Sequence, residues 1–110
     1  MPLEITFRDF PSTPALEAHV RERAAKLEHF ARGIVRCHVT VEAPHRRSQH
    51  GDRYHVRIDL GLADGDLHVS RDHGANGALE DAYAAIDDAF KRAERQVAEH
   101  GNKRREGRHG

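Results

Sequence analysis

The sequence of 110 residues contains a single cysteine, Cys37, which excludes an intrachain disulfide. No apolar run approaches the roughly 18 residues that a membrane-spanning helix needs, and the first ten residues, MPLEITFRDF, lack the basic start and apolar stretch of a signal peptide. No glycine-rich phosphate loop, nucleophile elbow or paired-carboxylate motif is present. These absences predict a cytoplasmic protein without a membrane partner. They give no reason to expect an enzyme, a cofactor or a small-molecule substrate.

The sequence also lacks a net charge, because 18 Lys and Arg residues balance 18 Asp and Glu residues. A simple nucleic-acid-binding protein is usually clearly basic, so this balance argues against that class. The charges are unevenly spread, however, since residues 101–110 carry four basic residues and one acidic residue. The zero average therefore conceals a basic end.

What the sequence does contain is a clear succession of apolar periodicities. Alternation predicts strands over residues 3–7, 35–43, 53–62 and 67–70, and Asp64-Gly65 is a hairpin signal between the last two. Helical spacing predicts one helix from Pro14 to Ala31, capped by Thr13 and ended by Gly33, and another from Leu79 to Val97, capped by Asn76. The order is β-α-β-β-β-α. It predicts an α+β fold in which two helices pack on one face of a four-stranded mixed sheet.

The same periodicities assign the domain and its core. Residues 1–100 form a single domain, and residues 101–110 form a basic flexible tail without apolar periodicity. Cys37 faces the core and serves as a small apolar filler. The inward-facing positions of the second strand are Val35, Cys37, Val39, Val41 and Ala43, and the apolar stripe of the first helix is Leu16, Val20, Ala24, Leu27, Phe30 and Ala31.

Two segments carry a recognisable pattern. The first helix contains "AKLEHF", in which AKLE precedes an aromatic residue, and the last helix contains "DAYAAI" and then "RQ". Together with the element order, these motifs resemble the ribosome hibernation-promoting factor and ribosome-associated inhibitor family over about residues 3–100. The segment PHRRSQHGDRYHVRIDL is similar to a divergent branch of that family, and the chain resembles a short form without an additional C-terminal domain.

This resemblance implies a definite function. A family member would bind the small ribosomal subunit and its ribosomal RNA in the channel that messenger and transfer RNA use. Protein synthesis would be blocked and the idle ribosome protected. The sequence departs from the family pattern at three places. The loop SRDHGANGAL is longer, Ala93 stands where many members have Leu, and Lys91-Arg92 replaces the common Asp-Lys.

Basic residues on the two helices and in the tail are the candidate RNA contacts. Arginine suits this role because its planar guanidinium contacts phosphate oxygens in pairs. The alternative is a solvated surface, in which Asp87–Lys91 and Asp88–Arg92 form i,i+4 pairs along the last helix. The candidates are Arg21, Arg23 and Lys26 on the first helix, Lys91, Arg92 and Arg95 on the last helix, and Lys103, Arg104 and Arg105 in the tail.

A connector rich in histidine and arginine leaves a second function open. His45, Arg46, Arg47 and His50 can bind an anion or RNA. The chain would then be a divergent RNA- or anion-binding module of the same fold that does not act on ribosomes. The sequence does not set an oligomeric state under either hypothesis.

Three histidines raise the question of a metal. Alternation places His38, His55 and His68 on the sheet face opposite the helices. Zinc needs three or four ligands in close tetrahedral geometry, which strand pairing alone does not provide. We therefore expect a polar, solvated sheet face and no metal.

Overall fold

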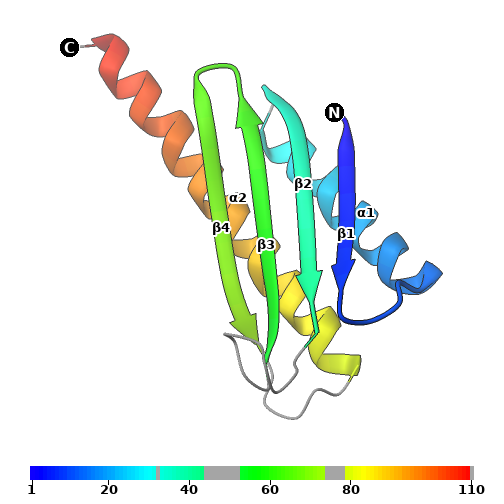
Figure 1. The fold of residues 1–110 in the computed structure, drawn as a ribbon. Helices are drawn as coiled ribbons and strands as arrows, with labels where there is room; N and C mark the ends of the chain where they lie inside the picture. Colours follow the sequence, from blue (N-terminus) through cyan, green and yellow to red (C-terminus); the bar gives the residue numbers. More distant parts are fainter. Residues whose placement is uncertain (32, 44–52, 74–78, 110) are drawn as a thin grey trace.

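A computed structural model describes the backbone of residues 1–31, 33–43, 53–73 and 79–109, and side chains as far as Gly101 except that of Leu79. Its elements follow the order that the sequence predicts, so the α+β prediction is confirmed (Figure 1). They are β1 (Leu3–Arg8), α1 (Pro14–Phe30), β2 (Ile34–Glu42), β3 (Tyr54–Leu62), β4 (Gly65–His73) and α2 (Leu79–His109). The predicted caps and connectors at 44–52 and 74–78, including Asn76, lie outside the described residues.

The four strands form one sheet in the order β1-β2-β3-β4. β1 runs parallel to β2, and the other two pairs are antiparallel. Both helices lie on the same face of the sheet, α1 behind β1 and β2, and α2 behind β3 and β4 (Figure 1). The opposite face is left without a covering element in the described part of the chain.

Local signals explain where α1 begins and ends. Thr13 is the N-cap, and its hydroxyl accepts a hydrogen bond of 3.1 Å from the backbone N–H of Leu16. Pro14 follows in the first helical position, where its missing N–H costs nothing. After Phe30 the chain leaves the helix through Ala31, and Gly33 adopts a φ of 117°, which glycine tolerates without strain.

The core lies between the sheet and the helices, and two of its predicted members are wrong. Val35 is 50% exposed, because the pairing of β2 with β3 shifts register between Ile34 and Arg36 and turns Ile34 inward instead. Phe30 is 59% exposed at the last position of α1. The other assigned positions of α1 and β2 are buried or pack against the core.

The last helix is longer than its apolar stripe. Among its described side chains the last buried one is Val97, but the helix continues to His109 and so runs into the segment for which the sequence predicts a tail. The side chains of that segment lie outside the described residues. Within the part of the chain that the structure describes, neither helix has the length and apolarity to cross a membrane.

Candidate nucleic-acid interface

A polar cluster joins the two helices. Arg23 on α1 donates a hydrogen bond of 3.2 Å from Nη2 to Glu94 Oε2 on α2, and its Nη1 lies 3.7 Å from Asp87 Oδ1. His19 Nε2 contacts the same Asp87 oxygen at 2.7 Å. The guanidinium of Arg23 also lies over the Phe90 ring, 5.9 Å from its centroid, and only 15% of the side chain is exposed. Arg23 therefore lies between the helices and not on the exposed flank that the sequence predicts for it.

The acidic residues of α2 do not form the i,i+4 pairs considered from the sequence. Asp87 contacts His19 and Arg23, and Asp88 Oδ2 accepts a hydrogen bond of 3.1 Å from Arg71 Nε on β4. Lys91 and Arg92 are exposed, and within the described residues no ion pair includes either of them. The two carboxylates four residues before Lys91 and Arg92, Asp87 and Asp88, are engaged by other elements.

Five exposed Lys and Arg side chains on the described parts of the helices thus have no ion pair with another described residue, and we refer to four of them, all except Arg21, as the helix cations. Arg23 and Asp87 lie where α1 and α2 contact each other. Lys26 lies three residues after Arg23 on α1, and Lys91 lies four residues after Asp87 on α2, so each is adjacent to one of them on the helix surface. Arg95 follows one turn after Lys91. The helix cations are Lys26, Lys91, Arg92 and Arg95; none has an ion pair with another described residue.

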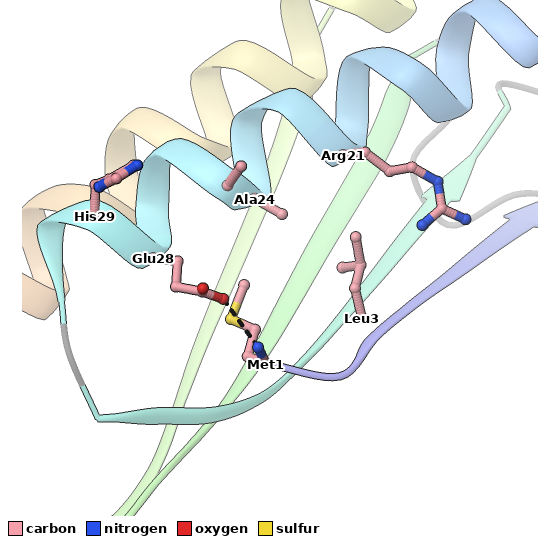
Figure 2. Close-up of a pocket in the computed structure, with 7 residues that line it drawn as sticks. Met1, Leu3, Arg21, Ala24, Glu28 and His29 are labelled. Carbon is pink, nitrogen blue, oxygen red and sulfur yellow. Dashed lines mark hydrogen bonds and ion pairs between the residues drawn. The ribbon is translucent and has the colours of Figure 1, made fainter.

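Arg21 lies on the other flank of α1, toward the edge strand β1. There it lines an open pocket of about 400 Å³ between α1 and the N-terminus (Figure 2). The terminal ammonium group of Met1 contacts Glu28 Oε2 at 3.0 Å in the same pocket. The structure therefore separates Arg21 from the helix cations, with which the sequence analysis grouped it.

Most charges of the open sheet face are paired, although Arg8 on β1 is exposed and has no ion pair with another described residue. Arg36 Nη2 donates to Asp66 Oδ1 at 3.0 Å, and His55 Nδ1 lies 2.7 Å from Asp72 Oδ1. Asp59 contacts both Arg57 Nε at 2.9 Å and His68 Nδ1 at 2.6 Å. Burial alone would raise the pKa of Asp59, but these hydrogen bonds and the positive charges behind them lower it below its ordinary value. This face offers few unengaged cations to a polyanion.

Strand register decides the arrangement of the histidines. His38 lies opposite Asp59, which in turn lies opposite His68, whereas His55 lies opposite Glu42 and Asp72, four residues further along the sheet. His38 contacts the Thr6 hydroxyl at 2.9 Å. The three histidines are therefore not gathered at one point, and the described residues contain no group of three side chains suited to a metal ion.

The remaining candidates cannot be placed. His45, Arg46, Arg47 and His50 fall within residues 44–52, which lie outside the described residues. The side chains of Lys103, Arg104 and Arg105 lie outside them as well. Their expected contacts with RNA stay predictions.

Known proteins share both the sequence pattern and the fold. Residues 3–105 match the family described as sigma 54 modulation protein / S30EA ribosomal protein. The fold is similar to that of the protein Y N-terminal domain from Thermus thermophilus, with a TM-score of 0.68 and 24% identity over 88% of this chain and 96% of that one. It is also similar to a ribosomal subunit interface protein from Coxiella burnetii, with a TM-score of 0.70 and 14% identity over 93% of this chain and 99% of that one. At these identities the two structures establish the fold alone.

Proposed function

Because this chain belongs to the sigma 54 modulation protein / S30EA ribosomal protein family, we propose that it binds the small ribosomal subunit in the channel for messenger and transfer RNA and silences translation there. Silencing requires no chemistry. A rigid domain that occupies the channel excludes the RNAs that decoding needs, and the idle ribosome is kept intact. Ribosomal RNA is the partner of the proposed surface.

The main support for this proposal is that the helix cations are exposed and have no ion pair with another described residue. Lys26, Lys91, Arg92 and Arg95 are exposed, and the carboxylates one turn before Lys91 and Arg92, Asp87 and Asp88, are engaged by other side chains. Folded RNA is contacted mainly through its shape, phosphates and sugars, so exposed cations on a rigid surface suffice. The zero net charge is compatible with this role, because several cations of the sheet face are already paired with carboxylates.

Co-sedimentation with separated ribosomal subunits tests the surface. The helix triple variant combines Lys26→Gln, Lys91→Gln and Arg95→Gln. A sheet triple variant, with Arg8→Gln, Arg36→Gln and Arg57→Gln, removes the same charge from the opposite face. We expect the wild type and the sheet triple to pellet with small subunits at low salt, and the helix triple to bind about tenfold more weakly or worse. Equal binding by the two triples would exclude the helix surface.

A competition experiment tests the channel itself. Small subunits loaded with messenger and transfer RNA should bind the protein much more weakly than empty subunits, and a cell-free translation reaction should slow as the protein is added. Undiminished binding to loaded subunits would place the site elsewhere on the ribosome. Binding to isolated RNA without binding to ribosomes would instead favour the divergent RNA- or anion-binding module.

A further inference from the structure

Phe30 is an exposed aromatic side chain at the end of α1. It is 59% exposed, and among the described residues only Val35, at 50%, is another large hydrophobic side chain left on the surface. A single exposed apolar residue is ordinary in a folded protein. The meaning of Phe30 therefore depends on what surrounds it.

The packing of the two helices explains why its ring is uncovered. They run side by side in the same direction (Figure 1), and their contacts join residues 68 and 71 positions apart, in His19–Asp87 and Arg23–Glu94. The same spacing places Phe30 beside residues 98–101 of α2. Of these residues, Ala98 and Gly101 follow Glu94 by four and seven positions and so share the flank that faces α1. His100 instead contacts Asp64. Ala98 is exposed, and an added Cβ at Gly101 would meet nothing within 4 Å.

Nearer the N-terminal ends of the two helices, large side chains fill the space between α1 and α2. His19 packs edge-on against Tyr83 with ring centroids 5.1 Å apart, and Arg23 covers the Phe90 ring. At the level of Phe30, small residues on α2 leave open space beside an aromatic ring. This arrangement leaves room for a planar group.

The charges near Phe30 indicate which planar group would fit. Lys26 lies one turn before Phe30 on the same side of α1. On α2, Arg95 lies about one turn before the level of Phe30, at which the acid Glu99 is exposed. Lys91 lies one turn before Arg95. An RNA base stacks on an aromatic ring while nearby cations hold its phosphates, and such stacking tolerates any sequence. An apolar protein partner fits less well, because the cores of protein interfaces are depleted of lysine.

We infer that Phe30 is a stacking platform for an unpaired RNA base, held there by phosphate contacts to Lys26 and to the cations of α2. That the RNA is ribosomal rests on the proposed function. The stacking itself can be tested on any single-stranded RNA.

The absence of tryptophan from the chain makes a direct test possible. Phe30→Trp introduces a single indole whose fluorescence is quenched when a base stacks on it. We expect quenching when small subunits or a short unstructured oligonucleotide RNA are added. Val35→Trp, at a similarly exposed position, is the control and should stay unquenched. Binding without quenching of the Phe30→Trp variant, or a shift to shorter wavelength without quenching, would overturn the inference, the latter in favour of a protein contact.

An affinity series gives a second readout. Phe30→Tyr keeps the ring and should bind within about twofold of the wild type, whereas Phe30→Ala and Phe30→Leu should bind about 5- to 150-fold more weakly, as expected for the loss of one stacked base. Equal affinity of the Leu and Tyr variants would show that the aromatic ring is not used. Circular dichroism verifies that each variant is folded.

The two proposals fail in different ways. If the wild type does not pellet with ribosomal subunits, the proposed function fails, and the tryptophan titration with oligonucleotide RNA still decides whether Phe30 stacks on a base. If subunits bind and Phe30→Ala has no effect, the ribosome proposal stands and the stacking inference is wrong. If neither ribosomes nor RNA bind, both are wrong.

Discussion

The thiol of Cys37 is buried on β2, with 2% of the residue exposed. Burial, and then the negative charge of Asp59, raise its pKa from 9.0 to about 11. Because the thiolate is the reactive form, we expect iodoacetamide to leave the folded protein unmodified at neutral pH and to alkylate it fully in urea, as measured by mass spectrometry. Rapid alkylation of the folded protein would contradict the burial.

The same shift has a consequence for stability. The folded state holds the thiol proton more tightly than the unfolded state does. Its contribution to folding stability is therefore complete below pH 9.0 and is lost as the pH rises through about 11. Cys37→Ala should reduce this alkaline loss of stability, although Tyr54, whose pKa is also raised by burial and by Asp81, should retain part of it.

Gly61 is required by the side chain that crosses it. Arg36 lies opposite Gly61 and reaches over it to Asp66, and a Cβ at Gly61 would lie 2.6 Å from Arg36 Cγ. Gly61→Ala should therefore lower the free energy of unfolding by about 1 kcal/mol, the low end of the range for overpacking, because Arg36 can swing into solvent. Urea denaturation measures this loss.

A double variant shows whether Arg36 or the backbone conformation makes glycine necessary at position 61. In a chain that carries Arg36→Ala, the Gly61→Ala change should be neutral or stabilising, since alanine suits a strand better than glycine and nothing is left to clash. An equal loss in both backgrounds would mean that the backbone at Gly61, and not Arg36, requires glycine.

At the scale of the elements, Arg23 links α1 to α2. Its removal leaves Asp87 and the largely buried Glu94 without their guanidinium partner. The stability lost should lie between the loss for breaking an exposed ion pair and the loss for breaking a buried one. We expect Arg23→Ala to lower the free energy of unfolding by about 2 kcal/mol, and Lys26→Ala, one turn away and exposed, to change it by less than about 0.5 kcal/mol. Urea denaturation with an unchanged m-value is the measurement.

The outcome also decides the role of Arg23 in binding. A destabilised Arg23→Ala variant that still pellets with ribosomes would make Arg23 a structural residue. A variant as stable as Lys26→Ala that fails to bind would return Arg23 to the RNA-contacting surface that the sequence predicts.

Periodicity predicted the elements because it reports what one strand or helix buries. Thr13 and Pro14 likewise predict the start of α1, because the N-cap and the first helical position are local features of the sequence. The misplacement of Val35 has a different origin: the irregular pairing of β2 with β3 depends on two strands at once, and a single strand carries no signal for it. Phe30 is similar, because its exposure depends on small residues that lie about 70 positions away.

The candidate site was only partly predictable for the same reason. The helix cations are recognisable as basic residues off the apolar stripes. Which of them stay unpaired depends on contacts across the fold, such as Asp87 with His19 and Asp88 with Arg71. Acidic positions on the flank of α2 that faces basic positions of α1 would have been the signal to look for.

At the scale of the whole molecule, a net charge of zero conceals a division of charge. On the sheet face, Arg36 and Arg57 are each paired with an aspartate. The four helix cations have no such partner among the described residues, although the exposed acids Glu22 and Glu99 lie one turn from Lys26 and Arg95. We therefore expect a polyanion to bind the helix face in preference to the sheet face.

The salt dependence of ribosome binding should reveal this division. Each phosphate that a cation neutralises releases counterions, so the logarithm of the binding constant falls with the logarithm of salt concentration by about 0.7–0.9 per contact. The helix triple variant, Lys26→Gln, Lys91→Gln and Arg95→Gln, should flatten that slope by about 2 to 3. The sheet triple, Arg8→Gln, Arg36→Gln and Arg57→Gln, carries the same net charge and should keep the wild-type slope. Equal flattening in both triples would mean that total charge, and not the helix surface, governs the association.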